Sequence, residues 1–331
     1  MKTIIVTEET IYSGIFSVMF EDIVLNYDAK IINTYLSEKS RIKKIILNVL
    51  YKNKINRFLK GSFEKILKPK FSLVNILDKY KNENILVIFT NASLQKVYSE
   101  NNLKKIKGQY PKAKFILLFV DSIFQPQAKV AVELAEKNIF DIVYTYNQED
   151  AKAFGYYYWE TPYSTVNEFE KIEPSKGVYF CGSDKGRAEF LDKIASVLKN
   201  NNINFNFKVF GNKEKAYKNF KVLPVELKDY KEILKDTLEY NCILDIVQES
   251  NGEKCGLSLR AYEAVVYKRI LITNNPSIKK FKYYDPSYMH FIDNENDIKK
   301  EWLTQKVSSN YSGELSPVRF INDIENNLNT I

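Results

Sequence analysis

The sequence contains few of the residues that hold metals or form disulfides. Its 331 residues include three cysteines and one histidine, His290. Cys181, Cys242 and Cys255 are odd in number and far apart, and they show neither a CxxC pair nor a histidine at zinc-ligand spacing. We therefore expect reduced, buried thiols and no metal site. His290 lies in an aromatic-rich segment, so a catalytic role and a packed or surface position both remain open, and acid or base chemistry is expected from carboxylates.

Long apolar runs are also missing. No uninterrupted run approaches the ~20 residues that a membrane-spanning helix needs. The first residues, MKTIIVTEE, place Glu8 and Glu9 after a short apolar run, which argues against a secretory signal peptide. With 45% hydrophobic and 27% charged residues, the composition is that of a globular protein. We expect a cytoplasmic location, with peripheral association at the inner face of the cell membrane as a further option.

Much of the net charge of +8 comes from one stretch. Between residues 41 and 70 the only acid is Glu64. The basic residues of this stretch are Arg41, Lys43, Lys44, Lys52, Lys54, Arg57, Lys60, Lys65, Lys68 and Lys70. Apolar residues recur there at helical spacing, which predicts two amphipathic basic helices. Two interpretations stay open: contact with an anionic membrane surface, worth about 1 kcal/mol per cation, or ordinary domain helices with solvated cationic faces.

The chain is long enough for two α/β domains of ordinary size. Short apolar runs alternate with helical or polar stretches, which is typical of parallel sheets. The expected strands are residues 3–7, 85–89, 115–120, 139–144, 178–181, 205–210, 242–247 and 269–273. The sequence therefore predicts two Rossmann-like doubly wound domains, residues 1–170 and 176–310. In the last segment, 311–331, a helix is expected that could pack back on the first domain.

A loop of small and charged residues, GSDKGR, follows the first expected strand of the second domain and precedes a helix. Gly182 and Ser183 would let backbone amides approach a phosphate, and Lys185 and Arg187 would supply positive charge. Ligands of open α/β sheets bind beyond the carboxyl ends of the strands, where this loop is expected. Taken by itself, the GSDKGR sequence is explained equally well by an ordinary βα turn with surface cations.

A second helix opening, in the segment 256–275, carries Arg260 and Glu263 in its first turns. A glycine-opened helix can hold an anion at its N-terminus while a carboxylate binds neighbouring hydroxyls, as in the binding of a nucleoside diphosphate and its ribose. Because the two residues are three apart, an intrahelical surface ion pair is the alternative. Both phosphate-binding candidates fall in one doubly wound domain, so they can face one crevice.

Asp121 follows the expected strand at residues 115–120. A carboxylate at the carboxyl end of a strand in the first domain could point into an interdomain cleft and act as a general base or bind sugar hydroxyls. Helix capping or loop stabilisation is the alternative.

Five stretches together resemble a family of bacterial glycosyltransferase-like proteins from lipopolysaccharide and capsule clusters. They are DSI (121–123), FDIVYTYNQEDAKAFG (140–155), YFCGSDKGR (179–187), ILDIV (243–247) and GLSLRAYEAVVYKRILITNN (256–275), and their order and spacing match over roughly residues 115–293. The resemblance implies a GT-B architecture, in which two Rossmann-like domains face a cleft. The C-terminal domain would bind a nucleotide sugar and the N-terminal one the acceptor, although the first hundred residues match no pattern of the family.

The resemblance also implies site residues for a transfer that requires no metal. The implied nucleotide-sugar residues are Gly182, Ser183, Lys185, Arg187, Gly256, Leu257, Ser258, Arg260 and Glu263, with Asp245 and Glu249 as further candidate donor contacts. Glu263 would bind the donor ribose, and the three basic side chains would offset the diphosphate charge. Glu249 and Glu263 do not reproduce the spacing of the paired glutamates in the retaining branch of the fold, so stereochemistry is not carried over. Asp121 is the first candidate for the base that inversion needs.

The sequence thus predicts a glycosyltransferase of surface polysaccharide synthesis. Its donor is expected to be a UDP-sugar, its acceptor a glycan that is expected to be lipid-linked, and no cofactor is expected. A non-catalytic, nucleotide- or glycan-binding subunit of an assembly complex is the main alternative. Nucleic acid is not an expected partner, because no basic-aromatic motif such as an RRM signature occurs. The GxGxxG sequence of dinucleotide enzymes follows neither opening strand.

Overall fold

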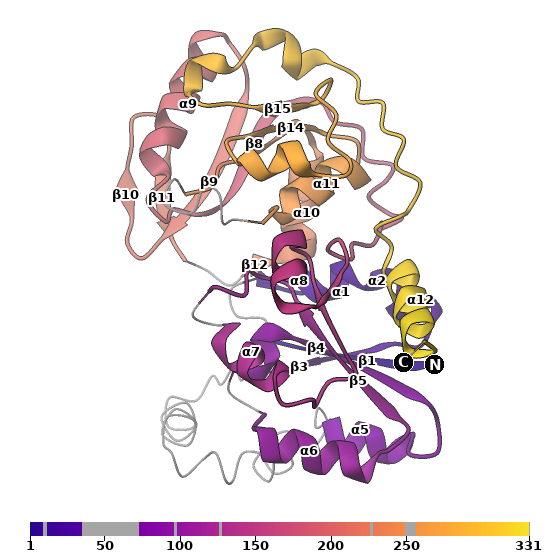
Figure 1. Ribbon diagram of the computed structural model, residues 1–331. Coiled ribbons are helices and arrows are strands. Elements are labelled where there is room, and N and C mark those ends of the chain that lie inside the picture. Colours follow the sequence, from indigo (N-terminus) through magenta and orange to yellow (C-terminus); the bar gives the residue numbers. More distant parts are fainter. Residues whose placement is uncertain are drawn as a thin grey trace. The chain divides into compact units, whose positions relative to one another are not determined.

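The computed structural model divides the chain into two compact units (Figure 1). It describes residues 1–8, 12–34, 73–95, 98–125, 128–225, 228–248 and 256–330. Unit 1 comprises Met1–Thr10, Met19–Pro162 and Leu315–Ile331, and unit 2 comprises Ile11–Val18 and Tyr163–Glu314. The basic stretch 41–70, Glu249 and Cys255 lie outside the described residues, so the predictions made for them stay predictions.

Unit 1 is built on a six-stranded sheet in which every strand pair is parallel. In sheet order the strands are β3 (Lys30–Asn33), β1 (Lys2–Thr7), β4 (Ile85–Thr90), β5 (Ala113–Phe119), β6 (Ile142–Thr145) and β7 (Tyr157–Tyr158). β1 and β4 are buried along their whole length. Because both faces of such a sheet are covered, its four central strands are nearly continuous apolar runs, which made them visible in the sequence.

Helices cover both faces of this sheet. They are α2 (Glu21–Asn26), α5 (Leu73–Lys79), η1 (Asn91–Leu94), α6 (Glu100–Gln109), α7 (Lys129–Ala135), α8 (Gln148–Phe154) and α12 (Pro317–Leu328). Leu77, Leu103 and Leu134, from α5, α6 and α7, pack with the strands in one apolar cluster. On the other face, the Phe320 ring of α12 meets the Tyr144 ring of β6 at 5.1 Å, edge to face.

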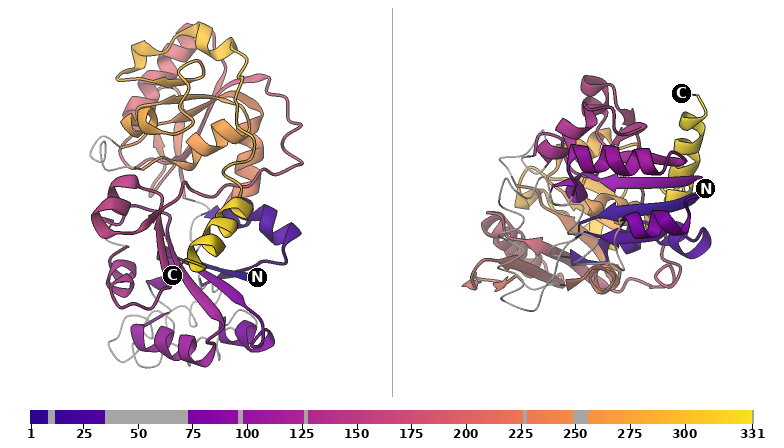
Figure 2. Two further views of the ribbon diagram at one scale, coloured as in Figure 1. Left: turned by 45° about the vertical axis from the view of Figure 1, so that its right-hand side comes forward. Right: turned by 90° about the horizontal axis from the view of Figure 1, so that it is seen from below.

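The last helix, α12, packs against elements from the first part of the chain. Ser316 caps the helix, Pro317 occupies its first turn, and the Ser316 hydroxyl donates to Asp22 Oδ2 at 2.6 Å. The amino group of Met1 lies 3.6 Å from Glu325, and Figure 2 shows the two termini close together. Residues of α12 are therefore part of unit 1.

Unit 2 contains a seven-stranded sheet, parallel except for the pair β10 and β11 at one edge. In sheet order the strands are β10 (Lys215–Ala216), β11 (Lys221–Pro224), β9 (Phe205–Gly211), β8 (Lys176–Ser183), β13 (Tyr240–Asp245), β14 (Ile270–Thr273) and β15 (Met289–Phe291). Two further short strands, β2 (Tyr12–Ser13) and β12 (Lys228–Asp229), pair in parallel beside it.

Both faces of this second sheet are also covered. Its helices are α1 (Ile15–Met19), α9 (Ala188–Asn200), α10 (Tyr230–Leu238), α11 (Leu259–Val266), η4 (Pro276–Lys280), η5 (Glu295–Asp297) and η6 (Lys300–Thr304). Successive β8 side chains point to opposite faces. Phe180 packs with α9, whereas Tyr179 and Cys181 pack on the face of α10 and α11.

The two doubly wound α/β units agree with the fold class predicted from the sequence. Some strand ends differ. β13 ends at Asp245 rather than at Val247, because the backbone of Val247 bonds to the side chain of Asn274 instead of continuing the ladder. The sequence reading missed α10 and the short strands β3, β7, β10, β11 and β15, which lie at or next to the sheet edges and whose few residues carry little periodicity.

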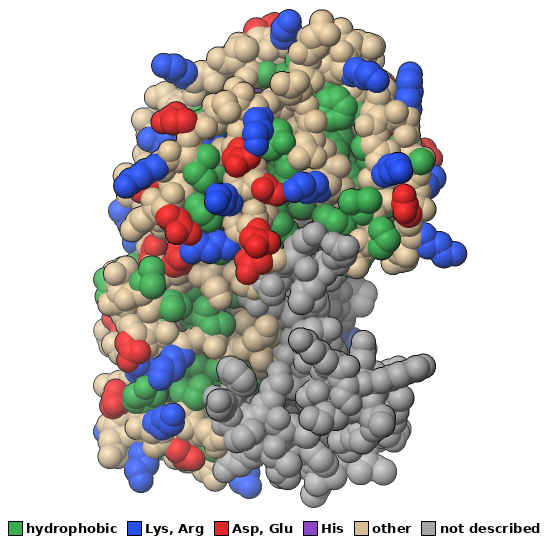
Figure 3. Space-filling view, turned by 180° about the vertical axis from the view of Figure 1, so that it is seen from behind, with side chains coloured by type: hydrophobic (Ala, Val, Ile, Leu, Met, Phe, Trp, Pro, Cys, Tyr) green, Lys and Arg blue, Asp and Glu red, His purple; other side chains and the backbone are tan. Residues whose placement is uncertain are grey.

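The surfaces of the described residues show mixed charge. Figure 3 shows Lys and Arg side chains interspersed with Asp and Glu on the face seen there. Within the described ranges, no helix combines the length and apolar character needed to cross a membrane.

Candidate functional site

Polar side chains stand at the carboxyl ends of three neighbouring strands of unit 2. Ser183, Asp245 and Thr273 are the last residues of β8, β13 and β14, which lie side by side in the sheet. Asp245 is only 2% exposed, and the Thr273 hydroxyl donates to its Oδ2 at 3.0 Å. This edge is where open α/β sheets bind ligands.

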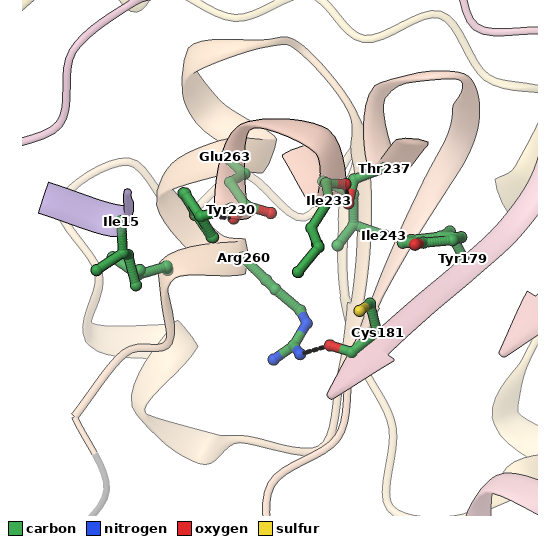
Figure 4. A pocket seen from close by; sticks show the side chains of 10 residues that line it. Ile15, Tyr179, Cys181, Tyr230, Ile233, Thr237, Ile243, Arg260 and Glu263 are labelled. Atoms are coloured by element: carbon green, nitrogen blue, oxygen red, sulfur yellow. Dashed lines mark hydrogen bonds between the residues drawn. The ribbon is translucent and has the colours of Figure 1, made fainter. Parts of the chain in front are cut away.

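Arg260 of α11 crosses the end of β8 at this edge (Figure 4). Its Nη2 donates to the carbonyl oxygen of Cys181, and its Nη1 lies 3.4 Å from Asp245 Oδ1. A Cβ on Gly182 would come within 2.8 Å of Nη2, so glycine at this position gives the guanidinium its room. The guanidinium carbon lies 5.1 Å from the centre of the Phe180 ring. Arg260 is thus fixed by β8 and β13 while 21% of its side chain stays accessible.

Glu263, one turn further along α11, is 5% exposed and accepts a hydrogen bond from the Tyr230 hydroxyl of α10. That hydroxyl lies 3.1 Å from the hydroxyl of Tyr163. Burial raises the pKa of Glu263, while the Tyr230 hydrogen bond and the Arg260 charge oppose the increase. The interpretation of Arg260 and Glu263 as a surface ion pair is therefore wrong, since Glu263 is buried and the recorded salt bridge of Arg260 is to Asp245.

These side chains open onto a cavity of ≈ 200 Å³. Its lining residues are Ile15, Tyr179, Cys181, Tyr230, Ile233, Thr237, Ile243, Leu259, Arg260 and Glu263, all of unit 2. Figure 4 shows Ile233 and Ile243 between Glu263 and Tyr230 on one side and Tyr179 on the other, with Ile15 beyond Tyr230. The buried Tyr179 hydroxyl has no hydrogen-bond partner among the described residues. An unpartnered buried hydroxyl is costly, so this end of the cavity favours a polar occupant.

The GSDKGR loop lies at the same edge. Asp184 Oδ1 accepts from the Ala188 amide at 3.0 Å and so begins α9. Arg187 donates to the carbonyl oxygen of Ile246, and its guanidinium carbon lies 5.6 Å from the Phe180 ring centre. Lys185 is exposed and has a left-handed backbone, with φ of 43°. A second cavity of ≈ 380 Å³ is lined here by Gly186, Arg187, Glu189, Phe190, Lys193, Ile246, Val247, Gln248 and Asn274.

The predicted helix opening also lies at this edge. Gly256, Leu257 and Ser258 directly precede α11, with Ser258 in the N-cap position. The Ser258 hydroxyl makes no capping bond to the helix and is buried without a partner among the described residues. Of the predicted nucleotide-sugar residues, those that the structure describes therefore gather at the carboxyl edge of one sheet.

The other predicted residues are placed as follows. Asp121 belongs to unit 1, is exposed and follows β5 by two residues. His290 is buried in β15 and stacks on Trp302 with ring centres 4.1 Å apart, and burial lowers its pKa. Cys181 and Cys242 are buried free thiols. Within the described ranges, no group of three or more His, Cys, Asp or Glu side chains is placed to hold a metal ion.

Sequence reasoning missed four side chains of the site: Tyr163, Tyr179, Tyr230 and Thr273. Tyr230 begins α10, whose N-cap residue Asp229 accepts from the Lys231 amide at 2.8 Å. That aspartate, followed by apolar residues at helical spacing, was a usable signal for the helix. Nothing local in the sequence pairs Tyr163 with Tyr230, which follows it by 67 residues.

Comparison with known proteins supports the fold. No protein-family model and no curated protein sequence matches the chain. The structure is similar to an alpha-glucosyltransferase in complex with UDP and a mismatched 13-mer DNA, with a TM-score of 0.54, 12% identity and coverage of 90% of this chain and 87% of that one. It is also similar to MnaA of S. aureus in complex with UDP, with a TM-score of 0.50, 11% identity and coverage of 100% and 98%. The chain therefore has the two-domain, Rossmann-like GT-B fold.

Proposed function

We propose that this protein is a glycosyltransferase whose donor is a nucleoside-diphosphate sugar, with a UDP-sugar as the first candidate. One observation carries the proposal: a fixed, partly accessible Arg260 and a buried Glu263 share a cavity at the carboxyl edge of a parallel sheet. A cation suits a diphosphate, and a carboxylate suits ribose hydroxyls. Both similar structures named above were solved with UDP.

The proposed role of the basic groups is to stabilise charge on the departing diphosphate. Arg260, Arg187 and Lys185 all lie at this edge, as do the N-termini of α9 and α11. Fixed cations and helix-end amides act where negative charge develops in the transition state. We propose that they replace a divalent cation, so activity should persist in excess EDTA.

In the proposed reaction, the acceptor hydroxyl oxygen forms a bond to the anomeric carbon of the sugar. The bond from that carbon to the diphosphate breaks, and the nucleoside diphosphate leaves with the bonding electrons. The hydroxyl proton passes to a carboxylate base, for which Asp121 in unit 1 is our candidate. The acceptor side of this proposal, a glycan or lipid-linked glycan of bacterial surface polysaccharides, is supported by the sequence resemblance alone.

The test begins with calorimetry of the purified chain against UDP and other nucleoside diphosphates. Arg260→Ala should weaken the binding of UDP, whereas Lys221→Ala, which removes a surface cation elsewhere in unit 2, should not. Mass spectrometry of incubations with nucleotide sugars then detects hydrolysis or transfer. If no nucleoside diphosphate binds, the proposal fails. Binding without any hydrolysis or transfer supports a non-catalytic subunit instead.

A further inference from the structure

The carboxylate of Glu263 accepts a hydrogen bond from a residue of another helix. Among the described residues, the structure records one hydrogen bond to its carboxylate, from the Tyr230 hydroxyl to Oε1. Tyr230 begins α10, whereas Glu263 lies in α11, and both side chains line the ≈ 200 Å³ cavity. An ionised carboxylate has two oxygens with about four lone-pair sites, so one bond to Oε1 leaves acceptor capacity for a ligand.

The direction of the hydrogen bonds follows from chemistry. A carboxylate only accepts, so Tyr230 must donate its single hydroxyl proton to Glu263. The hydroxyl of Tyr163 lies 3.1 Å from that of Tyr230, and it must therefore be the donor in this second bond. Tyr163 is 0% exposed, so bulk water does not compete for its hydroxyl. Successive hydrogen bonds of this kind polarise and strengthen one another.

The groups around Glu263 make its charge state depend on this chain. Burial and the neighbouring carboxylate of Asp245 raise its pKa, whereas Tyr230 and the cation of Arg260 lower it. Cys181 of β8 and the Tyr163 hydroxyl are also close enough to interact electrostatically with the carboxylate. Of the two groups that lower the pKa of Glu263, Arg260 also forms a salt bridge with Asp245, whereas the proton of the Tyr230 hydroxyl is directed at Glu263.

We propose that Tyr230 and Tyr163 are positioning residues, which hold one oxygen of Glu263 so that the carboxylate can accept hydrogen bonds from ligand hydroxyls in the cavity. The assignment of those hydroxyls to a nucleotide ribose rests on the proposed function. The hydroxyl chain itself does not, because it is present without a ligand. Neither tyrosine has to touch the ligand to act.

The first experiment needs no ligand. In the full-length protein, the side-chain carboxyl carbon of Glu263 is titrated by ¹³C NMR and assigned by its absence in Glu263→Gln. Tyr230→Phe should raise the pKa of Glu263, and Tyr163→Phe should raise it by less. Tyr240→Phe is the matched control, because the half-buried Tyr240 hydroxyl accepts a hydrogen bond from Asn206 Nδ2 instead. An unchanged Glu263 titration in both Tyr230→Phe and Tyr163→Phe overturns the proposal.

The second experiment measures UDP binding by calorimetry between pH 5.5 and 8.5. Tyr230→Phe should weaken binding about tenfold at neutral pH, the scale expected for loss of a hydrogen bond to a charged group. The pH below which affinity falls should also move upward. In a Glu263→Gln background the same substitution should have no further effect, because it acts through Glu263. Additive losses would overturn the positioning role. If the wild-type protein binds no UDP, the proposed function fails, and the titration alone decides the role of the hydroxyl chain.

Discussion

Both sheets are built mainly from parallel strands, and β14 of unit 2 ends in a buried threonine, Thr273, as three strands of unit 1 do, but β13 of unit 2 ends differently. In unit 1, β1, β4 and β6 end in threonines, each 0% exposed: Thr7, Thr90 and Thr145. In unit 2, β13 ends in the buried carboxylate of Asp245, with Arg260 and Glu263 beside it. The carboxylate that follows β5 in unit 1, Asp121, is exposed.

This difference shows that the chain tolerates the cost of buried charge in unit 2. A buried neutral hydroxyl needs only one partner, whereas a buried charge costs several kcal/mol unless it is paired. Unit 2 keeps two buried carboxylates near one guanidinium, and burial, with a smaller contribution from Asp245, raises the pKa of Glu263. Perturbed pKa values of this kind, beside a cavity, mark candidate functional sites. Unit 2 is therefore the half in which we expect ligand recognition to be preset.

The largest expected effect concerns the exposed carboxylate of unit 1. If Asp121 is the base, Asp121→Asn should lower the rate of sugar transfer by about 10² to 10⁴, the range of general base catalysis. UDP affinity, which we assign to unit 2, should stay nearly unchanged. Rates come from a coupled or mass-spectrometric transfer assay and affinities from calorimetry. Wild-type turnover in this variant would remove Asp121 from the mechanism.

A pair of substitutions tests the strand ends directly. Asp245→Ala removes the partner of a partly buried guanidinium and should lower the free energy of unfolding of unit 2 by about 3 kcal/mol. Thr90→Val in unit 1 keeps the shape of the side chain and should cost about 1 kcal/mol or less, since the bond that the Thr90 hydroxyl makes within the described part of the chain is a long one of 3.4 Å to the Val6 carbonyl oxygen. Native-state hydrogen exchange resolves the strands of each unit. Equal losses would show that the two kinds of strand end are energetically alike.

A glycine pair separates function from stability. Gly182→Ala should displace the Arg260 guanidinium, since the new Cβ would meet Nη2, and weaken UDP binding about tenfold. The displaced atom is the far end of a flexible side chain, so thermal stability should change little. Gly108→Ala in α6 of unit 1 is the control, because its Cβ meets nothing within 4 Å and the helix should gain about 1 kcal/mol. A Gly182→Ala protein with full affinity and lost stability would contradict this role of the glycine.

The smallest expected effect is the pH dependence of stability that Glu263 contributes in unit 2. Because the pKa of Glu263 is raised in the folded state, the native protein binds this proton more tightly than the unfolded chain does. The contribution to stability is present below the unfolded pKa and is lost as pH rises through the folded pKa. Glu263→Gln, which stays neutral, should therefore gain stability relative to wild type from about pH 4.5 upward. Denaturant midpoints across pH measure this, and a constant difference would contradict it.

Several features could be predicted because their signals are local. β4 and residues 115–119 of β5 form largely apolar runs that are buried on both faces, and they appear in the sequence as such. The strand expected at residues 242–247 is present, although it ends at Asp245, and the helix expected after the 256–258 opening begins directly after Ser258. The partner of Arg260 could not be read in the same way. Helical spacing suggested Glu263, but the structure pairs Arg260 with Asp245, which precedes it by 15 residues.

The sequence by itself determined the class of fold and the stretches that carry polar groups to the carboxyl edges of the sheets, because strand burial and helix openings depend on neighbouring residues. Only the tertiary structure decided which of those groups are buried and paired. Glu263 accepts its hydrogen bond from Tyr230 of α10, and the space for the Arg260 guanidinium depends on the missing Cβ of Gly182 in β8. Such contacts depend on where separate elements cross, and residue spacing along one element does not encode that crossing.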